Sequence, residues 1–143
     1  MKLNLDCIRD LMLCIETNTG LHQSCHFIDI SLNEEMEQIG DIQPPMPYQS
    51  ELLMQYDNDE LIYHLYYCIK ADLLTVSESS DSYITLIDDL TPKGHDFLAH
   101  IRPMKVWDKI KRVAEPVGAL TVTHLTQIAS EIVVTEIKST LNL

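Results

Sequence analysis

The sequence of 143 residues lacks the features that mark membrane and secreted proteins. No run approaches the roughly 18 consecutive apolar residues that a transmembrane helix requires. The first residues, Met1 to Asp6, lack the apolar core of a signal peptide. We therefore expect a soluble protein of the cytoplasm that does not bind membranes.

Catalytic motifs are also missing. With only four glycines, the chain has no glycine-rich phosphate loop, and neither a Gly-x-Ser-x-Gly elbow nor a His-Glu-x-x-His pair occurs. A cysteine nucleophile and a histidine base would have to be brought together by the fold alone. We predict that the protein is not an enzyme and needs no cofactor.

The four cysteines lack the paired C-x-x-C spacing of structural zinc sites. Nitrogen and sulfur ligands are nevertheless present at His22, Cys25 and His26, and at His64 and Cys68 on one predicted helix. Because nothing indicates secretion, we expect reduced thiols in or near the core, and neither disulfides nor a bound metal.

The most informative segment, residues 86–101, reads as a strand that leads directly into a helix. Thr91 can cap this helix, and Pro92 suits its first turn because it has no N–H to leave unpaired. Upstream, residues 72–76 and 83–87 are β-rich runs separated by a polar turn. These signals predict a β-hairpin that forms the wing of a winged helix-turn-helix.

The N-terminal half predicts further elements. Apolar residues at helical spacing indicate a helix over residues 3–17, and the composition of residues 26–31 indicates a strand that pairs with the hairpin. Residues 33–50 contain prolines that exclude a continuous helix, so we interpret them as a surface loop with at most a short helical turn. Such a loop could also carry recognition residues.

A helix is predicted from Asp57 to about Ala71, with Asp57 as its N-cap. In a winged helix the element before the wing is the recognition helix, whose N-terminal end lies nearest the bases. Here that end carries Asp57, Asp59 and Glu60, and these carboxylates would be repelled by DNA phosphates. Tyr63, Tyr66 and Tyr67 could form a contact surface on this helix or pack over the core.

The net charge of −12 is unevenly distributed, because segment 93–112 has a net charge of +4 and the rest of the chain −16. Its basic strip could contact phosphates or could pair internally with the acidic first ninety residues, and we favour internal pairing. The candidate DNA- or partner-binding residues are Lys93, Arg102, Lys105, Lys109, Lys111, Arg112, Tyr63 and Tyr67.

The last third predicts a helix near residues 106–114, an interruption at Pro116 and Gly118, and a long helix from Leu120 to about Leu141. Thr121 or Thr123 could cap the long helix. Its apolar side either folds over the domain or pairs with a second copy, which would make a homodimer. A peripheral membrane helix is a less favoured third alternative, because Glu131 and Glu136 with the single Lys138 give no basic face for anionic lipid. The apolar side comprises Leu125, Ile128, Ala129, Ile132, Val133 and Ile137.

Four sequence blocks together resemble the bacterial and prophage-associated domain-of-unknown-function 2513 family. They are residues 1–10, Tyr63-His64-Leu65, residues 89–98 and Ile101-Arg102 with Val106-Trp107. The resemblance covers nearly the whole chain and is weakest at residues 31–56. It implies a winged-helix-like domain and a mobile-element context. The family has no established activity, so the resemblance assigns no site residues, and we interpret His64 and His95 as buried hydrogen-bonding side chains.

We therefore predict a mainly α, α+β chain with two parts: a winged-helix-like domain over residues 1–102 with a small antiparallel hairpin, and a C-terminal helical extension over residues 103–143. One functional hypothesis is a dimeric, DNA-binding transcriptional regulator that uses the basic strip, including Lys109 and Arg112. The alternative is an acidic interaction module that engages a basic protein, as a phage-encoded modulator or a mimic of nucleic-acid charge, and binds no DNA.

Overall fold

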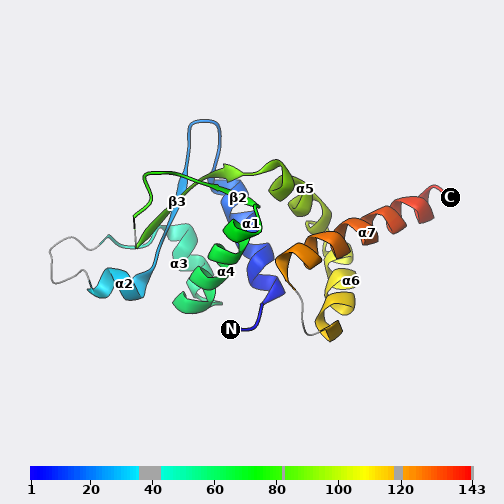
Figure 1. The fold of residues 1–143 in the computed structure, drawn as a ribbon, viewed down its shortest axis with the longest axis horizontal. Helices are drawn as coiled ribbons and strands as arrows, with labels where there is room; N and C mark the ends of the chain where they lie inside the picture. Colours follow the sequence, from blue (N-terminus) through cyan, green and yellow to red (C-terminus); the bar gives the residue numbers. More distant parts are fainter. Residues whose placement is uncertain (36–42, 82, 118–120, 143) are drawn as a thin grey trace.

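The computed structural model describes residues 1–35, 43–81, 83–117 and 121–142 (Figure 1). It is mainly helical with one small antiparallel sheet, which confirms the predicted α+β class. In chain order the elements are α1 (Leu5–Asn18), β1 (Cys25–Ile28), α2 (Ile30–Glu35), α3 (Pro47–Leu53), α4 (Asn58–Lys70), β2 (Leu74–Val76), β3 (Ile84–Leu90), α5 (Pro92–Ile101), α6 (Met104–Ala114), a 3₁₀ turn (Glu115–Val117) and α7 (Val122–Thr140).

The sheet has the strand order β1-β3-β2, with both pairs antiparallel. The predicted hairpin is confirmed as β2 and β3, in which Leu74 lies opposite Leu90. Strand β1 pairs with the other edge of β3, with Cys25 opposite Ile87. In Figure 1, helices α1, α3 and α4 lie below this sheet. The long-range pairing therefore joins the N-terminal segment to the hairpin.

The predicted strand over residues 26–31 is too long at its C-terminal end, because β1 ends at Ile28 and α2 begins at Ile30. The cause is Asp29, whose Oδ1 accepts hydrogen bonds from the backbone N–H groups of Ser31 and Leu32. A carboxylate that binds these early N–H groups starts a helix. The β-rich composition of residues 26–31 did not reveal this helix start at Asp29.

The segment 33–50 is more helical than the expected loop with a short turn, because α2 continues to Glu35 and α3 begins at Pro47, which occupies its first turn. Residues 36–42 of that loop lie outside the described residues. Helix α3 closes the outer edge of β1. Tyr48 exchanges two hydrogen bonds with the backbone of His26, and the fully buried Gln49 does the same with Ile28. Side chains thus satisfy backbone groups that an open edge strand would expose.

The join between β3 and α5 is confirmed in detail. Thr91 caps α5 by accepting a hydrogen bond from the Gly94 N–H, and its own N–H donates to the Leu73 carbonyl at 3.0 Å. Gly94 lies so close to this carbonyl that an added Cβ would overlap the oxygen. The absence of a side chain at Gly94 therefore lets α5 approach the start of β2.

The core is formed by the apolar faces of α1, α4, α5, α6 and the first part of α7 together with the sheet. The predicted apolar residues of α1, which are Leu5, Ile8, Leu11, Met12 and Ile15, are all buried. All four cysteines are free, and three of them are fully buried. Burial raises the pKa of Cys25 and Cys68 to about 12 in each case, which leaves both thiols protonated and unreactive.

The C-terminal region contains two helices, as predicted, although α6 begins at Met104 and therefore earlier than expected. Thr121 caps α7 by accepting a hydrogen bond from the His124 N–H, which decides between the two expected caps. Along α7, Leu125 and Ala129 are buried, but Ile137 is 53% exposed, so the predicted apolar side does not extend that far. Within the described ranges, no helix has both the length and the apolar character that a membrane span needs.

Substitution of Gly94 by alanine should destabilise the fold by about 2–3 kcal/mol. Intrinsic helix propensity favours alanine over glycine, so a loss of stability would report the overlap with the Leu73 carbonyl. The measurement is urea unfolding followed by the fluorescence of Trp107. Gly20→Ala is the matched control, because nothing lies within 4 Å of a Cβ there. Equal stabilities for the two variants would contradict the prediction.

Candidate functional site

Helix α4 is held by its buried face, which leaves few of its side chains for an external contact. Leu61, His64, Leu65 and Cys68 are fully buried. The N-terminal end is acidic, as predicted: Asp57 is the N-cap and accepts a hydrogen bond from the Glu60 N–H at 2.8 Å. We refer to Asp57, Asp59 and Glu60 as the acidic end of α4.

Basic residues are missing from most of the N-terminal part of the sequence. Between Arg9 and Lys70 there is no lysine or arginine, and none occurs between Lys70 and Lys93. These stretches include α2, α3, nearly all of α4, and the β2–β3 hairpin. The turn of the hairpin carries the exposed carboxylates Glu78 and Asp81. Both the hairpin and the acidic end of α4 therefore repel phosphate groups.

The predicted basic strip lies on α5 and α6, and several of its side chains are engaged within the molecule. Arg102 forms an ion pair with Glu16 of α1 at 2.6 Å, which raises the pKa of the guanidinium. Lys109 pairs with Glu136 of α7. Lys93 donates a hydrogen bond from Nζ to the Ala71 carbonyl at 3.1 Å. The expected pairing with the acidic first ninety residues fits the contact of Arg102 with Glu16, whereas Lys109 pairs within the C-terminal extension.

Asp6 links the N-terminus of α1 to α6 through two side chains. It accepts a hydrogen bond from Nε1 of the buried Trp107 at 2.9 Å, and its carboxylate lies 3.1 Å from the Lys111 ammonium. Partial burial acts to raise the pKa of Asp6, but the Trp107 hydrogen bond and Lys111 outweigh it, so the pKa is lowered. The folded protein therefore favours the ionised form of Asp6.

The remaining residues of the basic strip, Lys105 and Arg112, are exposed. Arg112 donates a long hydrogen bond from Nε to the Asp108 carbonyl at 3.4 Å. Lys109, and to a smaller extent Lys105, lowers the pKa of Glu136. Lys105 and Arg112 are thus the members of the strip that are best placed to meet an external anion.

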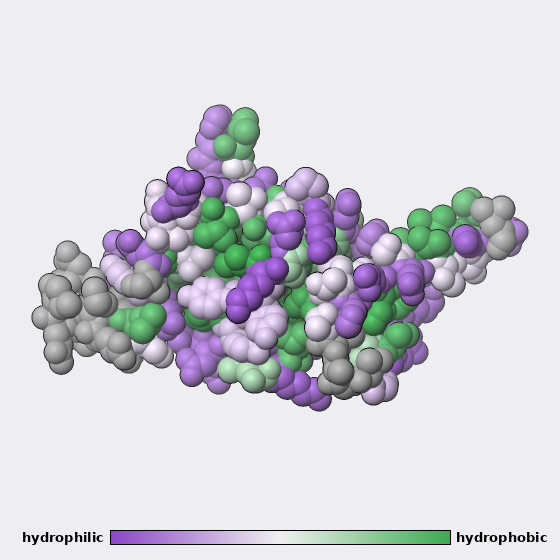
Figure 2. Space-filling model, viewed as in Figure 1, coloured by the Kyte–Doolittle hydropathy of each residue, from purple (hydrophilic) through white to green (hydrophobic). Residues whose placement is uncertain are grey.

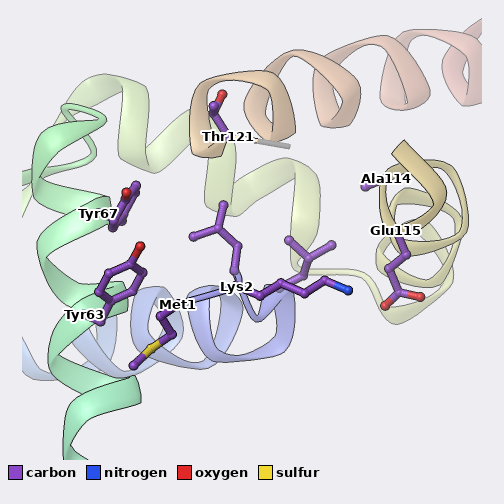
Figure 3. A pocket seen from close by; sticks show the side chains of 9 residues that line it. Met1, Lys2, Tyr63, Tyr67, Ala114, Glu115 and Thr121 are labelled. Carbon is purple, nitrogen blue, oxygen red and sulfur yellow. The ribbon is translucent and has the colours of Figure 1, made fainter. Parts of the chain in front are cut away.

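Tyr63 and Tyr67 line a pocket of about 280 Å³ (Figure 3). Its other walls come from the N-terminal segment, the end of α6 and the start of α7, and include Leu3, Glu115 and Thr121. The two tyrosine rings lie 4.7 Å apart. The lining mixes the tyrosine rings and apolar side chains such as Leu5 with the charged Lys2 and Glu115. Tyr63 lies one helical turn from Glu60 of the acidic end of α4, whose Oε1 accepts a hydrogen bond from the Asn4 side chain.

A family model described as "Hypothetical protein (DUF2513)" matches residues 2–120. The chain belongs to the DUF2513 family. No curated protein and no solved structure matches it. The family description assigns no activity, so a functional argument for this DUF2513 protein depends on its own side chains.

The two histidines in the family-like blocks have different environments. His64 is fully buried and accepts a hydrogen bond from the Asn4 N–H at Nε2, while Nδ1 lies 2.7 Å from the Glu60 carbonyl. A ring that accepts at Nε2 carries its proton at Nδ1, so His64 is neutral in this network. The interpretation of His95 as buried is wrong, since it is exposed, with its Nε2 3.6 Å from Asp89.

The structure also tests the metal-ligand alternatives. Among the residues that the structure describes, no three His, Cys, Asp or Glu side chains come together in a group that could hold a metal ion. His64 directs both ring nitrogens to protein partners, as described above, so neither is free to bind a metal next to Cys68.

Sequence reasoning missed Asp6 and Glu16 as partners of the basic strip. Asp6 is four positions from Asp10 and shares the polar face of α1 with it, and nothing local distinguishes the two. The only sequence signal was that Asp6 and Trp107 both occur in the blocks that resemble the family. Their contact spans 101 positions, and the packing of α6 against the domain brings it about.

Asp6→Ala should lower the free energy of unfolding by about 1 kcal/mol near neutral pH, mainly because the buried Trp107 N–H loses its acceptor. Because folding lowers the pKa of Asp6, the part of its effect that requires the ionised carboxylate, chiefly the attraction to Lys111, is complete above the unfolded value of 3.8 and is lost as the pH falls through the lower folded value. Urea unfolding of both proteins over a pH series checks this. The exposed Asp108→Ala is the control, and a stability difference independent of pH would contradict the prediction.

Proposed function

We propose that residues 1–102 form a winged-helix domain that binds a basic segment of a protein partner and not DNA. The order of elements supports the winged helix. Helices α1, α3 and α4 precede the β2–β3 hairpin, and β1 completes the sheet beside β3. In this arrangement α4 occupies the position of the recognition helix, and the hairpin is the wing.

The acidic end of α4 is the observation that carries the proposal. A DNA-binding winged helix directs this end into the major groove, between two rows of phosphates. Here it presents Asp57 and Asp59, which are both exposed, and the wing adds Glu78 and Asp81. The same position is favourable for lysine or arginine side chains of a protein, because opposite charges steer association and suppress wrong partners.

The contacts of the basic strip support the same conclusion. DNA binding through the strip would compete with the pairs Arg102–Glu16, Lys109–Glu136 and Lys111–Asp6. Each pair joins different helices, so these basic residues already have a role in the arrangement of the fold. Surface pairs are individually weak, but together they reduce the positive charge available to an external anion.

In cellular terms, we propose a cytoplasmic, phage-encoded modulator that engages a basic host or phage protein and acts as a homodimer through residues 103–143. A DNA-binding regulator is the second candidate, and the exposed Lys105 and Arg112 favour it. The two functions differ in the sign of charge that they require from the partner.

Fluorescence anisotropy distinguishes the candidates with two labelled probes, an arginine-rich peptide and a mixed-sequence DNA duplex, across a salt series. We expect peptide binding that weakens with salt and no duplex binding at physiological salt. The triple variant Asp57→Asn, Asp59→Asn, Glu60→Gln should weaken peptide binding by about tenfold. These substitutions retain side-chain oxygens that can accept the cap and Asn4 hydrogen bonds of the native residues.

The matched control is the triple variant Asp96→Asn, Asp108→Asn, Glu115→Gln, which removes the same charge from exposed positions of α5, α6 and the turn that follows. It should bind the peptide as the wild type does. Equal weakening in both triple variants would show non-specific attraction and contradict the proposal. Duplex binding that Lys105→Glu with Arg112→Glu abolishes would establish the DNA-binding regulator instead.

A further inference from the structure

Helix α7 has a second set of apolar residues, which are largely exposed to solvent. Its inner face, with Leu125 and Ala129, packs against α5 and α6. On the outer side, Val134, Ile137 and Leu141 are 46%, 53% and 60% exposed, and we refer to these three residues as the outer stripe. Figure 1 shows the C-terminal end of α7 extending away from the other elements, and Figure 2 shows hydrophobic side chains along this extension.

The outer stripe has the spacing of a helix-pairing seam. Its members follow each other at intervals of three and four positions, which is the a/d pattern of a coiled coil. The pattern is narrow, because Glu131, Thr135 and Lys138 around it are exposed and polar. A narrow apolar seam with polar flanks fits one other helix better than a broad apolar surface.

The charges beside the outer stripe are self-complementary. Glu131 and Lys138 lie seven positions apart, so they occupy equivalent heptad positions on the same edge of the stripe. When two identical helices pack antiparallel about a two-fold axis, this edge of one helix meets the same edge of the other. Glu131 of each copy then lies near Lys138 of the other, and each of the two pairs joins opposite charges.

The charge of the whole chain also favours a second copy at this face. Residues 104–141 contain five basic and four acidic residues, whereas the rest of the chain contains five basic and eighteen acidic ones. Two molecules of such an acidic protein repel each other at most orientations, and the repulsion is smallest where the α6 and α7 faces meet.

An apolar hollow adjoins the outer stripe. It has a volume of about 270 Å³ and is lined by Val106 of α6 together with Val133, Ile137 and Leu141 of α7. A hollow next to an exposed seam gives an aliphatic side chain from an opposing helix a place to pack. It therefore increases the apolar area that a second α7 could cover.

We propose that the outer stripe is the interface with a second copy of this chain, which packs its own α7 antiparallel to the first. Val134 packs against Ile137 of the second copy, the reverse contact follows from the two-fold axis, and two Glu131–Lys138 pairs lie along one edge of the seam. The proposal rests on the homodimer part of the proposed function and assigns its residues and helix direction.

Analytical ultracentrifugation of the full chain over a wide concentration range tests the interface. The wild type should be a dimer that dissociates on dilution. Ile137→Glu should weaken the dimer at least about 100-fold, because it places two carboxylates in the apolar seam. Thr123→Glu, at an exposed position in the first turn of the same helix, is the matched control and should leave the dimer unchanged.

A charge exchange tests the direction of the helices. Glu131→Lys alone and Lys138→Glu alone should each weaken the dimer about tenfold, because each places like charges opposite each other. The double exchange should restore wild-type affinity, since it re-forms both pairs in the antiparallel arrangement.

A monomeric wild type, or a dimer insensitive to Ile137→Glu, would overturn the proposal, and failure of the double exchange to restore affinity would overturn the antiparallel arrangement. Binding of the arginine-rich peptide, measured on the same protein, distinguishes failure of this interface from failure of the proposed function. A monomer that still binds the peptide at the acidic end of α4 would contradict the interface and leave the domain's binding role intact.

Discussion

The close approach of α5 to the start of β2 is the constraint on which the arrangement of the C-terminal half depends. The Leu73 carbonyl accepts a hydrogen bond from Thr91 and lies against the bare Cα of Gly94. This contact fixes the direction in which the chain leaves the hairpin, and α5 in turn contacts α1, α6 and α7. A side chain at Gly94 would overlap this carbonyl, so α5 would have to move away from β2.

Polar contacts at the edge of the apolar core join α1 to the end of α5 and to α6. Asp6 binds Trp107 and Lys111, Glu16 binds Arg102, and Arg9 donates to the Ile101 and Arg102 carbonyls. All of these partners on the N-terminal side lie on α1. The basic residues of the C-terminal half therefore compensate the acidic α1 locally, while the acidic end of α4 and the β2–β3 hairpin keep their negative charge.

This division of charge connects the fold with the proposed function. In the winged helix that we propose, α4 and the β2–β3 hairpin are the elements that meet the ligand, and they carry the exposed carboxylates Asp57, Asp59, Glu78 and Asp81. The family match shows where the chain belongs but assigns no ligand. Of the features that bear on function, the sign of the charge at these elements is therefore the most informative, and it favours a basic protein over a nucleic acid.

The sequence alone determined the elements whose signals are local: the Asp57 and Thr91 caps, Pro92 in the first turn of α5, the hairpin around a polar turn, and the apolar spacing of α1 and α4. Neighbouring residues set these features, so a short window contains the information. Tertiary structure decided which face of each element meets which partner. It placed Asp6 beside Trp107, closed β1 with Tyr48 and Gln49, and left Ile137 exposed on α7. Such pairings depend on how distant helices pack, and the pattern of a single helix does not specify its neighbour.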